Sequence, residues 1–155
     1  MVAGATGLVG IVLRYGAFYG PGTSVAIGGD IVEMLRGRKF PLIGNGAGVW
    51  SFIHIDDAAE ATRVAIQQGP AGIYNIVDDE PVTKRENAAA LAAAAGARTW
   101  IPGPGGLAKL LGDRTTSLTR SLRVSNARFR EATDWSPRFP SVREGYRDMA
   151  ERMPR

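Results

Sequence analysis

The consecutive segments Gly10–Tyr15 (GIVLRY) and Gly16–Thr23 (GAFYGPGT) decide the fold class of this chain of 155 residues. The first is a nearly continuous apolar run with β-branched residues, which is typical of a strand buried in a parallel sheet. The second contains Gly20-Pro21-Gly22 and is typical of a loop. Because α/β sheets bind ligands at the carboxyl ends of their strands, this loop is the first candidate binding site. An aromatic-packed turn is the alternative interpretation.

The rest of the chain alternates between strand and helix patterns and shows no internal repeat or low-complexity linker. Capping-box patterns predict helix starts at residues 57–60, 83–86 and 141–144. In chain order we expect a helix over 25–38, strands over 40–43 and 50–55, a helix over 57–68, a strand over 72–77, a helix from 83 closed by Gly96, an extended segment over 98–101, and helices over 107–111, 126–133 and 142–153. This order predicts a single α/β domain over residues 1–155 with some parallel pairing.

Composition excludes several classes of protein. Hydrophobic residues make up 45% of the chain and charged residues 22%, which is typical of a globular protein. Cysteine is absent, so disulfides, thiolate metal sites and a cysteine nucleophile are excluded, and a cytoplasmic location is expected. No stretch approaches the ~18 apolar residues that span a bilayer, so we expect no membrane partner. The net charge is +4, and the basic excess lies from Arg98 onward. The basic residues of this part are spread along predicted helices, which favours a solvated face over nucleic-acid binding.

Three glycines near the start, Gly4, Gly7 and Gly10, form a G-x-x-G-x-x-G pattern. Such loops hold a pyrophosphate by bringing it against bare backbone at a helix N-terminus, so the three glycines are candidate cofactor-binding residues. The residues that follow here have a strand pattern where a helix is required. A turn leading into the strand is therefore the alternative.

Ser51, His54 and Asp56 or Asp57 invite interpretation as a catalytic triad. Alternation along a strand puts Ser51 and His54 on opposite faces, which argues against that triad. His54 is the only histidine in the sequence, and a hydrogen-bonded core histidine is the favoured interpretation. Because no second histidine or cysteine exists, we expect no metal site.

Four stretches, in order and spacing, resemble the extended short-chain dehydrogenases/reductases, the NAD-dependent epimerase/dehydratase family. They are Gly10–Thr23; Trp50–Ala59 (WSFIHIDDAA); Gly72–Val77 (GIYNIV); and Ser125–Pro137 with Val142–Gly145. The resemblance covers the family's C-terminal half. It implies a partial Rossmann-like sheet of a few parallel strands with a C-terminal helical substrate-binding region, and NAD or NADP as the cofactor.

The resemblance also implies residue roles. Tyr15 and Gly16 correspond to residues beside the nicotinamide, whereas Phe18, Tyr19, Thr23, Phe40, Ile43 and Trp50 correspond to the substrate side. Trp50 stands where sugar-nucleotide relatives commonly have an arginine on the substrate diphosphate. An indole cannot make that charge-assisted contact, so a flatter and less charged small-molecule substrate is expected.

Family members carry a Tyr-x-x-x-Lys pair in which the tyrosine is the acid/base, yet no tyrosine here has a lysine four positions later. We therefore assign no catalytic residue and leave enzymatic activity of the chain alone open. The leading hypothesis is the substrate-binding portion of an NAD(P)-dependent epimerase, dehydratase or reductase, as a truncated product or one part of a split enzyme. The alternative is a non-catalytic ligand-binding pseudoenzyme or oligomerising module. In either case we expect a homo-oligomer or a missing N-terminal half as partner, because the predicted strands are too apolar to face water.

Overall fold

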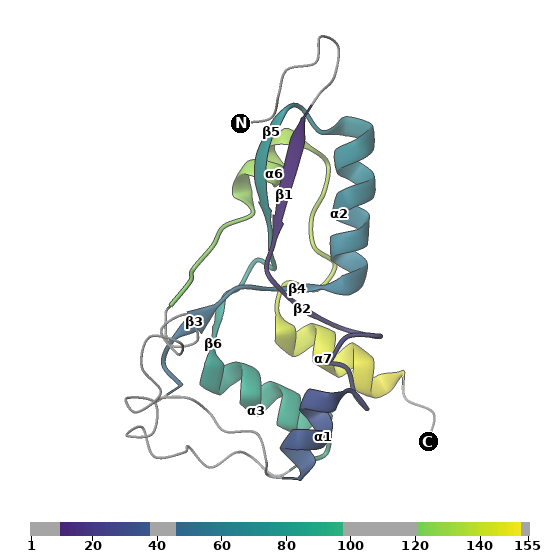
Figure 1. Cartoon of the computed structure of the whole chain (residues 1–155), viewed down its shortest axis with the longest axis vertical. Coiled ribbons are helices and arrows are strands. Elements are labelled where there is room, and N and C mark those ends of the chain that lie inside the picture. Colours follow the sequence, from purple (N-terminus) through teal and green to yellow (C-terminus); the bar gives the residue numbers. More distant parts are fainter. Residues whose placement is uncertain (1–9, 38–45, 98–120, 153–155) are drawn as a thin grey trace.

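The computed structural model describes residues 10–37, 46–97 and 121–152, which form a mixed α/β fold (Figure 1). The strands are β1 (Ile11–Tyr15), β2 (Ala17–Tyr19), β3 (Val49–Trp50), β4 (Phe52–His54), β5 (Gly72–Ile76) and β6 (Val82–Thr83). The helices are α1 (Asp30–Arg36), α2 (Ile55–Gln68), α3 (Lys84–Ala94), α6 (Ala127–Ala132) and α7 (Val142–Glu151). The predicted segments 40–43, 98–101 and 107–111 lie outside the described residues.

The parallel pair β1–β5 forms the upper part of the molecule in Figure 1. Its register pairs Ile11 with Gly72 and Tyr15 with Ile76. Parallel neighbours need a crossover connection, and α2, which leads directly into β5, provides it and packs on β1. The predicted partial Rossmann-like arrangement of a few parallel strands is therefore confirmed.

Two smaller sheets continue below this pair. Strand β2 pairs with β4 in parallel, and β3 pairs with β6 antiparallel. The chain changes partners at the end of β1: the Gly16 amide donates to the Ile76 carbonyl, and the next amide, of Ala17, donates to the Ser51 carbonyl. Helices α3 and α7 pack on each other beneath these strands, with α1 beside α3 (Figure 1).

Two clusters of buried residues form the interior. One lies between α2, α6 and the β1–β5 pair and contains Ile53, Ala58, Ala61, Val64, Ala65, Tyr74, Ile76, Phe129 and Trp135. The other lies where β2 and β4 meet α1, α3 and α7 and contains Tyr19, Val32, Leu35, Phe52, Val82, Leu91, Ala92, Ala95, Val142, Tyr146 and Met149. Because β2 and β4 connect the two clusters along the chain, they fix the position of the region at the end of β1.

The second capping box is confirmed. The Thr83 side chain accepts a hydrogen bond from the Glu86 amide, and the Glu86 carboxylate accepts one from the Thr83 amide. At the other end, Gly96 follows α3 with a φ of 62°, in the left-handed region that favours glycine. The last helix also begins as predicted, because the Ser141 side chain accepts from the Arg143 amide.

The predicted helix over 25–38 is wrong in its first turn and a half. The helix begins only at Asp30, and the preceding residues form turns. Gly28 has a φ of 86°, which a right-handed helix does not contain. At Gly29 a Cβ would lie 2.7 Å from the Ser24 carbonyl oxygen, so the backbone itself closes this turn.

The predicted helix start at Asp57 is also wrong. The helix begins at Ile55, and the cap is His54, whose Nδ1 accepts from the Asp56 amide. The Asp57 carboxylate is buried and instead accepts from the amides of Arg138 and Phe139. The acidic residue that local pattern assigns to a cap therefore holds a segment about eighty residues away in the chain.

Candidate functional site

A pocket of about 390 Å³ lies at the carboxyl ends of β1 and β5, where the chain passes from the upper sheet to β2. Its lining is mostly apolar or aromatic and comprises Arg14, Tyr15, Gly16, Ala17, Trp50, Ser51, Asn75, Val77, Leu122 and Val124. This is the position at which parallel α/β sheets bind ligands. Three of the predicted site residues, Tyr15, Gly16 and Trp50, meet there.

One wall of the pocket comes from residues 121–124, which we call the strap. The strap runs beside β3, with the Leu122 amide donating to the Val49 carbonyl and the Val49 amide donating to the Ser121 hydroxyl. Ser51 completes the attachment: its hydroxyl donates to the Leu122 carbonyl and accepts from the Val124 amide. These contacts span more than seventy residues of chain, and no local sequence pattern indicates them.

Gly16 lies between the two sheets because nothing larger fits there. A Cβ at this position would lie 2.8 Å from the Ser51 carbonyl oxygen and 3.0 Å from the Phe52 carbonyl carbon. The adjacent Tyr15 directs its hydroxyl to α2, where it lies 2.6 Å from the Thr62 hydroxyl. Tyr15 therefore borders the pocket with its hydroxyl already hydrogen-bonded.

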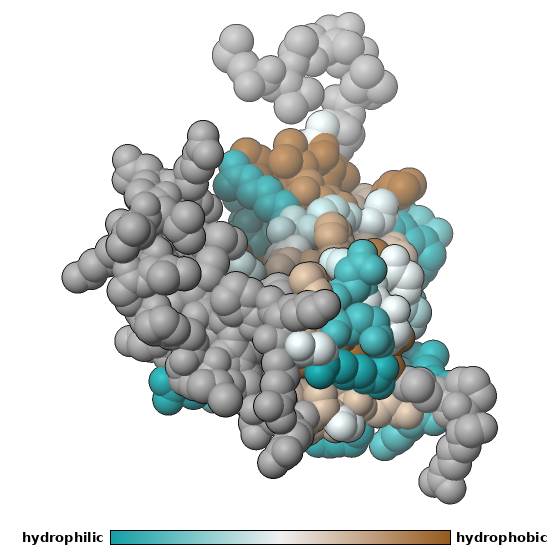
Figure 2. All heavy atoms as spheres, turned by 60° about the horizontal axis from the view of Figure 1, so that its bottom comes forward, coloured by the Kyte–Doolittle hydropathy of each residue, from teal (hydrophilic) through white to brown (hydrophobic). Residues whose placement is uncertain are grey.

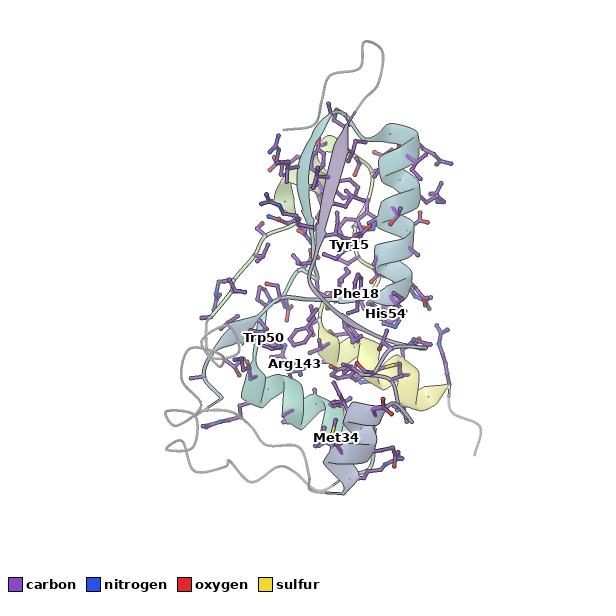
Figure 3. All side chains as sticks on the ribbon, viewed as in Figure 1. Tyr15, Phe18, Met34, Trp50, His54 and Arg143 are labelled. Carbon is purple, nitrogen blue, oxygen red and sulfur yellow. The ribbon has the colours of Figure 1, made fainter. Side chains whose placement is uncertain are left out.

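Trp50 contributes an aromatic side chain to the lining of the pocket. Its ring lies 6.3 Å from the Phe52 ring between centroids, and the Lys84 ammonium sits 4.5 Å above the indole. Figure 3 shows Trp50 on the lower strands and Tyr15 on the upper sheet. Burial lowers the pKa of Lys84. The ammonium above the indole face makes a cation–π contact.

Arg14 and Asn75 are the polar side chains of the lining that sequence reasoning missed. They are paired in the β1–β5 register, and in-register neighbours place their side chains on the same face of a sheet. Among the described residues, neither the Arg14 guanidinium nor the Asn75 side-chain amide has a hydrogen-bond partner. The signal that could have found Arg14 was a cation placed in an otherwise apolar strand.

The other predicted substrate residues lie elsewhere. Phe18 is 43% exposed and packs beside Tyr15, with 5.4 Å between ring centroids (Figure 3). The Thr23 hydroxyl serves a local turn by donating to the Gly20 carbonyl. Gly10 precedes β1, and its carbonyl accepts from the Gly72 amide. Gly4, Gly7, Phe40 and Ile43 lie outside the described residues.

Tyr19 corrects the prediction that Gly16–Thr23 is a loop, because Ala17–Tyr19 is a strand that carries the Tyr19 side chain into the core. The side chain is fully buried, and its hydroxyl donates to Asp78 at 3.1 Å and to the Ser141 carbonyl at 3.3 Å. The rings of His54 and Tyr146 stack edge-on against it. In this structure, Tyr19 contacts the core and not the pocket.

The residues around Tyr19 form a buried polar network. Burial raises the pKa of Asp78 to about 8, and burial together with the neighbouring Asp78 raises the pKa of Tyr19. Burial lowers the pKa of His54. Within the described residues, no group of acidic or histidine side chains is arranged to hold a metal ion.

The chain is similar in sequence to one protein family and to one curated protein. Residues 1–77 match the model of the NAD dependent epimerase/dehydratase family. A Streptomyces protein named 3-diazoavenalumate denitrifying reductase is 42% identical over 141 residues, which cover 89% of this chain and 46% of that protein. The chain therefore spans about half the length of this curated relative.

Solved structures agree with that relationship. Human epimerase family protein SDR39U1 (isoform 2), crystallised with NADPH, is 26% identical with a TM-score of 0.77 over 92% of this chain and 48% of its own. UDP-glucose 4-epimerase of Thermus thermophilus, complexed with NAD, is 27% identical with a TM-score of 0.66 over 94% of this chain and 46% of its own.

No described helix has the length and hydropathy of a membrane span.

Proposed function

In sequence and in fold the chain is a relative of the NAD dependent epimerase/dehydratase family, and we propose that it forms the substrate-binding portion of an NAD(P)-dependent reductase. The pocket between β1, β5 and the strap is the single observation that carries this proposal. It lies at the ligand-binding edge of a parallel sheet and combines a glycine turn with an aromatic wall.

The pocket suits one edge of a nicotinamide ring. Tyr15 and Gly16 line the pocket and would border that ring. Gly4, Gly7 and Gly10 are our candidates for the pyrophosphate. When bound, the cofactor supplies or accepts the hydride. The chain's own residues orient the substrate and exclude water from the contact.

The sequence contains no Tyr-x-x-x-Lys pair for proton transfer. No tyrosine is followed four positions later by lysine, and the Tyr15 hydroxyl is engaged by Thr62. We propose that the proton-transfer pair is contributed by polypeptide outside this sequence, so that the chain corresponds to the family's C-terminal half. The chain covers 46% of the reductase and 48% of the human epimerase family protein, so both are about twice as long.

The substrate proposed for the pocket is a small, flat molecule. Trp50 presents an aromatic face where a sugar diphosphate would need a cation, and the lining around it is mostly apolar. A reductase is favoured over an epimerase because the relative at 42% identity is named a reductase. We place this activity in the cytoplasm, in line with the absence of cysteine.

The uncovered face of the β1–β5 pair supports a polypeptide partner. Val12 is 37% exposed and Ile73 is 45% exposed, although both faces of parallel sheets are normally covered. Figure 2 shows hydrophobic surface, in brown, at the end of the molecule that carries the start of β1. We propose that an N-terminal half, or a second copy in a homo-oligomer, covers this face.

A second candidate function is a non-catalytic ligand-binding or oligomerising module. The observation that favours it is the engaged Tyr15 hydroxyl together with the missing Tyr-x-x-x-Lys pair. In that case the pocket holds a small molecule without transferring hydride.

Nucleotide titration separates the two functions. The purified chain is titrated with NADH and with NADPH while the reduced nicotinamide fluorescence is followed. Dissociation constants of about a millimolar or tighter, worth roughly 4 kcal/mol, are expected for the reductase portion. Binding of a flat neutral ligand without binding of either nucleotide would instead favour the non-catalytic module.

A further inference from the structure

We propose that Ser51 is a positioning residue of the pocket, whose hydroxyl fixes the strap while its backbone carbonyl fixes the Gly16–Ala17 part of the lining. This inference rests on the proposed function, because it concerns how the proposed ligand pocket keeps its shape. Ser51 is 8% exposed and lies between β3 and β4, among the residues that line the pocket.

The Ser51 hydroxyl holds the strap through two backbone groups at once. It donates to the Leu122 carbonyl at 3.2 Å and accepts from the Val124 amide at 3.0 Å. A hydroxyl can donate and accept together, so one side chain satisfies both groups. Leu122 is 56% exposed and the strap belongs to no described sheet, so the strap depends on such contacts to stay in place.

The backbone of Ser51 serves another part of the lining. Its carbonyl oxygen accepts from the Ala17 amide at 3.0 Å, and it lies 2.8 Å from the place that a Cβ at Gly16 would take. Gly16 and Ala17 line the pocket together with Leu122 and Val124. Ser51 therefore holds both parts of the lining in a fixed relation. A ligand that binds between parts already in place pays a smaller ordering cost.

The test removes the hydroxyl alone. Ser51→Ala keeps the carbonyl contact to Ala17 but releases the Leu122 carbonyl and the Val124 amide to water. Amide hydrogen–deuterium exchange is measured by NMR on the full 155-residue chain. The Val124 amide should exchange at least about tenfold faster in Ser51→Ala, because it has lost its acceptor. Ser51→Thr keeps a hydroxyl and should keep this amide protected.

Ligand binding is measured on the same proteins. NADH is titrated while its fluorescence is followed. Ser51→Ala should raise the dissociation constant on the order of fivefold, the effect expected for the net loss of about one hydrogen bond. Ser51→Thr should restore an affinity close to that of the unmodified chain.

Ser141→Ala is the matched control. The Ser141 side chain is also buried and also makes two hydrogen bonds, to the Arg143 amide and the Glu144 carboxylate, but Ser141 does not line the pocket. Each Ser→Ala variant should lower the melting temperature by about 2 to 4 °C. Ser141→Ala should change neither the exchange of the Val124 amide nor the affinity for NADH.

The outcomes separate this inference from the proposed function. An unchanged exchange rate of the Val124 amide in Ser51→Ala would overturn the inference. Faster exchange with an unchanged affinity would overturn it as well, and so would equal losses of affinity in Ser51→Ala and Ser141→Ala. If the unmodified chain binds no NADH, nucleotide binding by the proposed reductase portion fails, and the exchange comparison still decides whether Ser51 fixes the strap.

Discussion

The buried network around Tyr19 and the pocket beside Trp50 both contain aromatic and polar residues. They differ in whether the polar side chains have hydrogen-bond partners inside the protein. In the network, the Tyr19 hydroxyl bonds to Asp78 and to a backbone carbonyl, and the Tyr146 hydroxyl donates to Asn87. In the pocket, Arg14 and Asn75 face open space. Polar groups whose partners are inside the protein hold the fold together, whereas those that face a cavity without a partner are available to a ligand.

The adjacent residues Phe18 and Tyr19 show the same contrast on a single strand. Alternation along β2 sends Tyr19 into the lower core and Phe18 to the surface. Both were expected on the substrate side, yet neither lines the pocket. Aromatic type alone therefore does not identify a binding residue; the face of the strand does.

The largest change in the free energy of unfolding is expected from Tyr19→Ala. Removing a fully buried aromatic side chain should lower the free energy of unfolding by about 3 to 5 kcal/mol, because a cavity is left and Asp78 loses its donor. The matched variant Phe18→Ala should cost less than about 1 kcal/mol. Urea unfolding followed by circular dichroism measures both, and equal losses would contradict the division between the two faces of β2.

A smaller, pH-dependent effect is expected from Asp78→Asn. The pKa of Asp78 is about 8 in the folded protein against 3.8 for the ordinary side chain, so the unfolded chain ionises first as the pH rises. Stability contributed by this group is therefore full at acidic pH and is lost between about pH 4 and pH 8. The Asn variant lacks this loss.

The unfolding free energy of Asp78→Asn, measured relative to the unmodified chain, should accordingly rise from pH 5 to pH 8 by roughly 1 kcal/mol or more. Taking the difference cancels the opposite contribution of His54, whose lowered pKa makes stability fall as the pH drops. Asp134→Asn, at an exposed position, is the control. A flat difference for Asp78→Asn across this range would show that the Tyr19 network is not sensitive to the charge of Asp78.

The smallest effect on stability is expected from Arg14→Gln. Because the guanidinium has no partner among the described residues, its loss should change the unfolding free energy by no more than about 0.5 kcal/mol. Differential scanning calorimetry on the folded variant measures this. A loss of several kcal/mol would mean that Arg14 stabilises the fold, as the residues of the Tyr19 network do. The contrast between the network and the pocket would then not hold for Arg14.

Local patterns were enough to predict much of the fold. The apolar run at Ile11–Tyr15, the strand at Gly72–Ile76 and the capping box at Thr83–Glu86 all form as expected, because each depends on neighbours within a few residues. The likeness to nicotinamide-dependent epimerases and dehydratases also followed from such segments and agrees with the comparisons.

Features set by distant contacts could not be predicted. The burial of Tyr19 depends on α7, where a Cβ at Gly145 would clash with the Tyr19 ring. The sequence predicts that Asp57 caps a helix, but the Asp57 carboxylate accepts hydrogen bonds from the amides of Arg138 and Phe139. The pocket requires Ser51 to hold the strap, and in sequence Ser51 resembles an ordinary strand residue. Such pairings become visible only after the chain has folded.

The strap has a consequence for how this scaffold can diversify. Leu122 and Val124 shape one side of the cavity yet belong to no sheet, and they are fastened mainly through backbone groups and one serine. Exchanges at these two positions would therefore alter which molecules are accepted while leaving strand order untouched. Ligand preference and architecture can thus evolve at separate rates, because Ser51 holds the strap in place whichever side chains stand at these two positions.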